Sequence, residues 1–149
     1  MWRSSQPIKG ELQAQLREFF PSAILEDART VQAVMPDPMF YPLVRILGIR
    51  GLLEMSSIGA ITLIDVIAYP EELDRGTLFH ELVHAVQYRV LGLRRFAKLY
   101  VQGFLDGAGY EGIPLERQAY ELETRFRRNP KEVFSVEEDV IRRHEAGRL

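Results

Sequence analysis

The chain has 149 residues, of which 46% are apolar and 27% are charged, with no cysteine and a formal net charge of −2. This length suits one domain over residues 1–149, and the lack of cysteine excludes disulfides, thiol nucleophiles and cysteine-ligated metal sites. The near balance of 19 basic and 21 acidic residues gives no electrostatic footprint for nucleic acid, so we expect no such partner. Any metal must be held by carboxylates or by the three histidines.

The N-terminal residues and the apolar segments carry no targeting or membrane signal. Residues 1–7 are followed by polar residues and not by the apolar core of a signal peptide. The most apolar stretch, residues 39–55, is interrupted by proline, glycine and charged residues, so we expect no membrane span. The default expectation is a cytoplasmic location.

The first half of the chain holds segments of different character. Apolar residues at helical spacing predict a helix over residues 10–20. Residues 30–34 resemble a strand, residues 35–38 have turn chemistry, and residues 40–47 are compatible with a short helix. Residues 59–69 form a β-branched apolar run bounded by glycine and proline, which predicts a single strand.

The second half is predicted to be helical. Residues 74–92 show apolar positions at helical spacing between an aspartate N-cap and a glycine C-cap. A second helix is expected over residues 93–105, followed by a glycine-rich loop over residues 106–112. A proline opens a third helix over residues 114–128, and a capping box opens a fourth over residues 135–146. The predicted fold class is therefore α+β, with a small sheet and three or four helices.

The most informative motif is His80-Glu81-Leu82-Val83-His84, within the first of these helices. Histidines four residues apart lie on one helix face, where both imidazoles can bind the same zinc ion. Glu81 can reach a metal-bound water and act as general base. About 0.006 chance matches are expected for this composition. The alternative is a helix whose polar residues face solvent, and the apolar neighbours argue against it: Phe79, Leu82, Val83 and Val86.

A catalytic zinc site needs a third protein ligand, and the sequence offers several. Glu116 ranks first, because it lies in the first turn of its helix, at the edge of the predicted apolar stripe. Glu123 lies two turns further on nearly the same side and ranks second, and Asp106 ranks third. His144, the only other histidine, lies on a highly charged segment and is expected to be a surface residue.

Two known variants of this motif do not fit the chain. A metzincin would carry glycine and histidine three and six residues after His84, where this sequence has Gln87 and Val90. Peptide deformylases share the motif but use a cysteine ligand, which this chain lacks.

With Glu116 some thirty residues after the motif, the chain resembles the gluzincin branch of zinc metallopeptidases. In its compactness it resembles the minimal versions, sometimes called minigluzincins, and related bacterial zincin-like domains of unassigned function. The resemblance covers about residues 59–126. It implies a small, mainly antiparallel sheet packed on the active-site helix, with a glutamate-bearing helix and further helices beside it.

The resemblance also implies roles for individual residues. His80, His84 and Glu116 would bind Zn²⁺, and Glu81 would be the catalytic base. The segment 60–69 would be an edge strand that binds an extended peptide or protein substrate by strand addition.

Gluzincins often stabilise the oxyanion with a tyrosine or a histidine, and Tyr110 and Tyr120 are the candidates nearest to Glu116 in sequence. Tyr88 lies one turn beyond His84. Larger gluzincins often carry an aspartate four residues after the ligand glutamate to support an imidazole, but that position is Tyr120 here. Another carboxylate must then support the imidazole, or the site is looser.

The expected function is a zinc-dependent hydrolase, a small metallopeptidase that cleaves peptide bonds with a metal-activated water. The alternative is a catalytically silent or latent zincin-fold module that binds metal or peptide. It is considered because so short a chain has few residues to form the walls of a deep cleft. The sequence predicts no particular oligomeric state.

Overall fold

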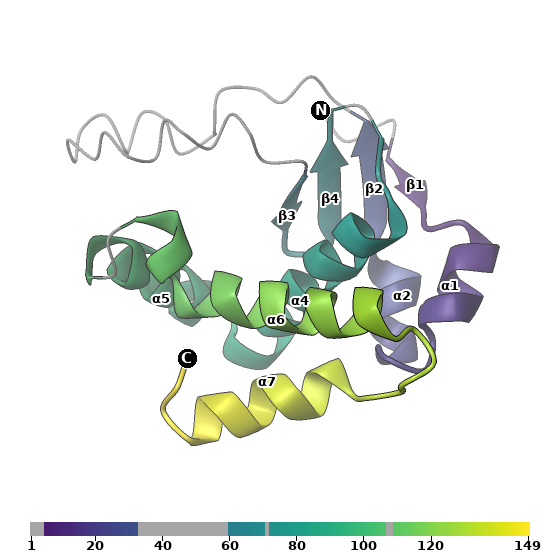
Figure 1. Cartoon of the computed structure of the whole chain (residues 1–149). Helices are drawn as coiled ribbons and strands as arrows, with labels where there is room; N and C mark the ends of the chain where they lie inside the picture. The colour runs from purple at the N-terminus through teal and green to yellow at the C-terminus, as the bar shows by residue number, and fades with distance from the viewer. Residues whose placement is uncertain (1–4, 33–59, 71, 107–108) are drawn as a thin grey trace.

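The computed structural model describes residues 5–32, 60–70, 72–106 and 109–149, which form an α+β fold (Figure 1). A small sheet lies above a set of packed helices, with α4 in the middle and α7 on the side away from the sheet. The turn expected over residues 35–38 and the helix expected over residues 40–47 lie outside the described residues.

The described sheet has four strands in the order β1-β2-β4-β3 and is mixed. The β1–β2 and β3–β4 pairs are antiparallel, whereas β2 and β4 are parallel. The mainly antiparallel sheet that we expected is thus interrupted by one parallel pair. The strands are β1 (Gln6–Pro7), β2 (Arg29–Gln32), β3 (Ile61–Leu63) and β4 (Val66–Tyr69).

The single strand predicted over residues 59–69 is wrong, because this segment is a hairpin of β3 and β4. The chain reverses at Ile64 and Asp65, and Ile64 takes a positive φ of 62°. β-Branched residues rarely adopt this conformation, and short hairpin turns usually carry glycine or asparagine there. The continuous run of apolar residues therefore concealed the turn.

The predicted helices of the second half are confirmed, together with their caps. Asp74 accepts hydrogen bonds from the backbone of Gly76 and Thr77, and Ser135 accepts one from Glu138. In the first half, the helix expected over residues 10–20 ends at residue 16, and α2 was not predicted. The described α-helices are α1 (Gly10–Leu16), α2 (Ser22–Asp27), α4 (Arg75–Leu91), α5 (Leu93–Asp106), α6 (Pro114–Arg128) and α7 (Val136–Glu145).

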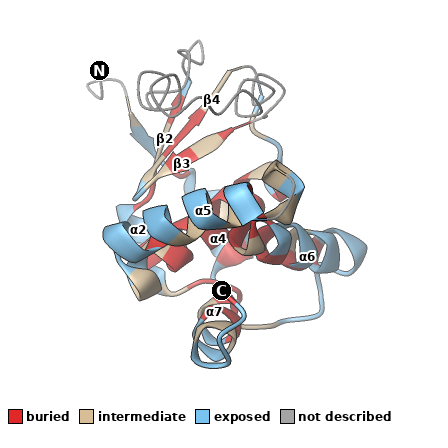
Figure 2. Cartoon of the chain, turned by 90° about the vertical axis from the view of Figure 1, so that its left-hand side faces the viewer, coloured by how far each residue is buried: buried red, intermediate tan, exposed pale blue. Residues whose placement is uncertain are grey.

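Helix α4 is the centre of the core, and Figure 2 shows it buried between the sheet and the other helices. It contacts β3, α2, α5, α6 and α7. Phe79 on α4 stacks on Phe126 of α6, with ring centroids 4.4 Å apart, and Phe19 packs edge-on against both rings. The helix that carries the His-Glu-x-x-His motif is therefore an interior helix. None of the described helices has the length and apolar character needed to cross a membrane.

Candidate metal centre

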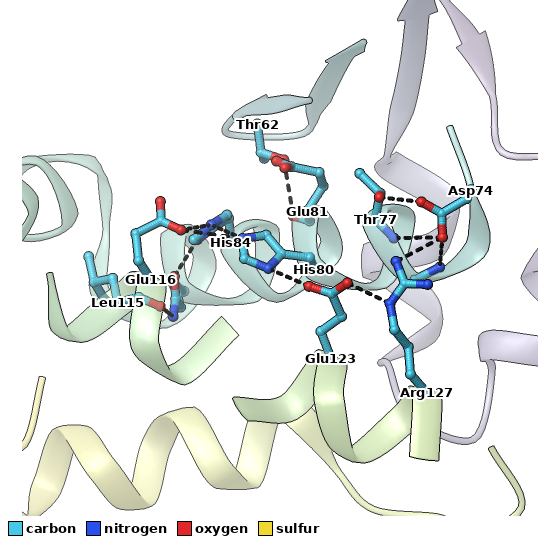
Figure 3. Close-up of polar contacts among 12 residues, drawn as sticks. Thr62, Asp74, Thr77, His80, Glu81, His84, Leu115, Glu116, Glu123 and Arg127 are labelled. Carbon is cyan, nitrogen blue, oxygen red and sulfur yellow. Dashed lines mark hydrogen bonds and ion pairs between the residues drawn. The ribbon is translucent and has the colours of Figure 1, made fainter. Parts of the chain in front are cut away.

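Three candidate ligand atoms meet between α4 and α6 (Figure 3). The Nε2 atoms of His80 and His84 are 3.2 Å apart. Oε2 of Glu116 lies 3.3 Å from the Nε2 atom of His80 and 3.4 Å from that of His84. All three residues are at most 6% exposed, so a solvent-facing motif is excluded. The structure therefore brings together the three residues that the sequence ranked first.

The size of this triangle matches the geometry of zinc. Ligand atoms bound at 2.0–2.1 Å to a tetrahedral zinc ion lie about 3.4 Å from one another. The three separations of 3.2, 3.3 and 3.4 Å are close to that length. The donor set, two imidazoles and one carboxylate, is also one that catalytic zinc sites use. These residues therefore fit a zinc ion in both chemistry and spacing.

The Nδ1 atom of each imidazole, which faces away from the triangle, already has a hydrogen-bond partner. Nδ1 of His80 lies 3.0 Å from Oε2 of Glu123. An ionised carboxylate can only accept a hydrogen bond, so Nδ1 of His80 must be the donor. Nδ1 of His84 lies 2.8 Å from Oε1 of Gln87, whose Nε2 donates to the carbonyl of Leu115. With the proton on Nδ1, each neutral ring presents its Nε2 lone pair to the Glu116 carboxylate. Two lone pairs and a carboxylate oxygen repel one another unless a cation or extra protons lie between them.

The pKa shifts of His80 and Glu116 also favour a positive charge between these groups. Burial alone lowers the pKa of His80, but Glu116 and Glu123 outweigh it and raise that pKa to about 9. Burial alone raises the pKa of Glu116, but His84 and His80 hold it well below its usual range. The field of the site thus favours positive charge between these groups, which is the condition for cation binding.

Glu123 supports His80 from outside the triangle. Its Oε1 accepts a hydrogen bond of 2.7 Å from Nε of Arg127, and Nη2 of Arg127 lies 2.8 Å from Oδ1 of Asp74 (Figure 3). A Cβ at Gly76 would lie 1.9 Å from Cζ of Arg127, so the guanidinium needs a glycine there. Glu123, seven residues after Glu116, is thus placed to orient the His80 imidazole, as the resemblance expects of a carboxylate, whereas position 120 is a tyrosine.

The other oxygen of Glu116 is held by a residue that sequence reasoning missed. The hydroxyl of Tyr100 on α5 donates to Oε1 of Glu116 at 2.8 Å. A Cβ at Gly103 would lie 2.7 Å from Cδ of Pro114, so a glycine allows α5 to lie against the start of α6. Tyr100 belongs to the apolar stripe of its helix and gives no signal of this role in sequence. Asp106 and His144 are not members of the described metal-ligand group.

The two predicted tyrosines lie at the edge of the centre. The half-buried Tyr110, in the 3-10 turn η2 (Tyr110–Gly112), interacts with the carboxylate of Glu116. Burial and the charge of Glu116 raise the pKa of Tyr110, so its hydroxyl keeps its proton. Tyr120 is 49% exposed, and its ring centroid lies 4.5 Å from that of His80. Both tyrosines therefore lie next to residues of the triangle, Tyr110 beside Glu116 and Tyr120 beside His80. Tyr88 instead stacks on Phe96.

Glu81 points from α4 toward the sheet (Figure 3). Its Oε2 accepts a hydrogen bond of 2.6 Å from the hydroxyl of Thr62 on β3, and both residues are buried. Burial raises the pKa of the Glu81 carboxyl, which is the direction that suits a general base working near neutral pH. β3 is an edge strand of the described sheet and packs beside α4. Thr62 thus links the glutamate of the motif to the strand expected to bind substrate.

In comparisons with models of protein families, with curated proteins and with solved structures, nothing matched the chain. The resemblance to gluzincins accordingly rests on the motif and on the spacing of the Glu helix. The geometry of the centre is an independent observation beside it.

The role of Glu123 can be tested without changing any of the three candidate ligands. We expect Glu123→Ala to weaken zinc binding by about 10- to 100-fold, because the His80 ring loses the acceptor that fixes its orientation. The measurement is a competition titration against a chromophoric chelator. Glu111→Ala is the matched control, since Glu111 is an exposed glutamate of the nearby turn η2 and its loss removes the same charge. Equal affinity in the two variants would contradict a supporting role for Glu123.

Proposed function

We propose that this chain is a zinc-dependent hydrolase, a small metallopeptidase with His80, His84 and Glu116 as its zinc ligands. The observation that carries the proposal is the triangle of candidate ligand atoms with sides of 3.2–3.4 Å, in which the Nδ1 atom of each imidazole faces a hydrogen-bond acceptor outside the triangle. Within the described residues the group has three members. Catalytic zinc sites use three protein ligands, whereas structural sites use four.

The side chains around the triangle fit the chemistry of peptide hydrolysis. Bound zinc supplies a Lewis acid that polarises the scissile carbonyl and lowers the pKa of a water molecule toward 7. Glu81 would accept the proton of the attacking water and pass it to the leaving amine. The hydroxyls of Tyr110 and Tyr120 would donate hydrogen bonds to the developing oxyanion. The edge strand β3 would bind an extended peptide through its backbone.

The burial of the ligands favours a second candidate, a metal-binding module that does not cleave peptides. The side chains of His80 and His84 are each 7% exposed, and that of Glu116 is 4% exposed. A substrate carbonyl needs access to the metal, so a permanently closed centre would be silent or latent. The two candidates share the zinc site and differ in hydrolysis.

One experiment separates these functions. The purified chain is analysed for metal content and incubated with casein and a peptide mixture, with and without 1,10-phenanthroline. We expect one zinc ion per chain and hydrolysis that the chelator abolishes and added Zn²⁺ restores. Stoichiometric zinc without any cleavage would establish the silent module, and a protein that binds no zinc would overturn both candidates.

A further inference from the structure

A continuous path of buried polar groups connects His84 to the C-terminal helix. His84 Nδ1 lies 2.8 Å from Oε1 of Gln87, and Nε2 of Gln87 donates to Oε1 of Gln118 at 3.0 Å. Nε2 of Gln118 donates in turn to Oδ1 of Asp139 on α7 at 2.8 Å. The path crosses from α4 through α6 to α7, which lies on the side of these helices away from the sheet (Figure 1).

The direction of every hydrogen bond in this path follows from its last member. The carboxylate of Asp139 can only accept, so Gln118 must turn its amide nitrogen to Asp139 and its oxygen to Gln87. Gln87 must then donate to Gln118, and it also donates to the carbonyl of Leu115. Its oxygen is left to accept the Nδ1 proton of His84. Asp139, through two amides, and the carbonyl of Leu115, directly, therefore both require that Nε2 of the neutral His84 ring carries the lone pair.

The path is buried, and its last residue, Asp139, is held by ion pairs. Gln87 and Gln118 have no exposed surface, so an unpaired amide in either would cost free energy. Asp139 is 8% exposed and forms ion pairs with Arg142 and with Arg143, whose Nε lies 2.8 Å from its Oδ1. Burial alone raises the pKa of Asp139, but the hydrogen bond from Gln118 and the arginine charges outweigh it and lower that pKa, so the carboxylate stays ionised.

We propose that Asp139 is a positioning residue of the metal centre, which acts through Gln118 and Gln87, together with the carbonyl of Leu115, to hold the orientation and the protonated nitrogen of His84. This inference rests on the proposed function, because it takes His84 as a metal ligand. It adds that α7 is part of the metal centre although it supplies no ligand. Since coupling between two sites is reciprocal, zinc binding must also stabilise the docking of α7.

The test compares variants of α7 in zinc affinity. We expect Asp139→Ala to weaken zinc binding about tenfold, the lower end of the range for groups that orient a ligand. Asp139→Asn should retain more of the affinity, because its amide oxygen can still accept from Gln118. Val140→Ala is the matched control, since Val140 is a fully buried neighbour outside the polar path. It should lower the melting temperature but leave zinc affinity within about twofold of the wild type.

The reciprocal effect is measured by hydrogen exchange of the α7 amides with and without zinc. Zinc should slow exchange in the wild type and in Val140→Ala, and should have little effect on α7 in Asp139→Ala.

Two results would overturn the inference while leaving the proposed function intact. One is wild-type zinc affinity in Asp139→Ala. The other is an equal loss of affinity in Val140→Ala and Asp139→Ala, which would show that α7 acts only through general stability. A wild-type chain that binds no zinc would instead overturn the inference and the proposed function together.

Discussion

Replacing Glu116 with alanine should weaken zinc binding by about 100- to 1000-fold. Structural zinc sites bind their ion with roughly 10–16 kcal/mol over four ligands, which is about 2.5–4 kcal/mol for each. A factor of ten in affinity corresponds to about 1.4 kcal/mol. Glu116 also supplies the only negative charge among the three ligand atoms. Metal analysis after dialysis, followed by competition titration with a chelator, measures this effect.

The design of this experiment must separate loss of a ligand from loss of the fold. Glu116→Ala leaves the hydroxyl of Tyr100 without its acceptor, so the melting temperature of each variant is compared with that of the metal-free wild type. Glu116→Gln keeps the volume and an acceptor for Tyr100, and should also bind zinc more weakly. Stoichiometric zinc in Glu116→Ala would move the third ligand to Glu123 or Asp106.

Replacing Glu81 with glutamine should leave zinc content unchanged and reduce hydrolysis by about 100- to 10,000-fold, the range typical of a general base. Glutamine has the same size and can still accept a hydrogen bond from Thr62, so we expect the fold to be retained. An amide cannot take up the proton of the attacking water. The comparison uses kcat/KM on any peptide that the wild type cleaves, together with zinc content.

A matched control for this variant is Glu111→Gln, because Glu111 is an exposed residue of η2 and should not affect the rate. Full activity in Glu81→Gln would rule out the proposed mechanism. His80→Ala, in contrast, should lose both zinc and hydrolysis, because it removes a ligand.

Much of the centre could be predicted because the positions of these residues depend on neighbours that are close in sequence. The four-residue spacing of His80 and His84 fixes their relation on any helix, and the cap at Asp74 depends on only three residues. The roles of Thr62 and Tyr100 could not be predicted, because they depend on how β3 and α5 pack against helices distant in sequence. The hairpin turn was missed for another reason, since the residue at its positive φ is a β-branched isoleucine.

Glu116 and Glu123 show the limit of such reasoning most clearly. They lie seven residues apart, nearly on one side of α6, so helical periodicity alone gives each a similar chance of meeting the imidazoles. Only the position of α6 along α4 makes one of them meet the Nε2 atoms and the other support the Nδ1 atom of His80.

The stacking of Phe79 on Phe126 therefore has a chemical consequence. Phe79 directly precedes His80, and Phe126 lies three residues after Glu123, so the stacked rings set the register between the two helices. A slide of α6 by two turns, about 10 Å, would bring Glu123 to the position of Glu116 and carry Glu116 away from the imidazoles. A contact between two apolar rings thus selects which of two chemically identical side chains is placed to act as the third ligand. The hydrophobic core thereby decides which carboxylate faces the two Nε2 atoms.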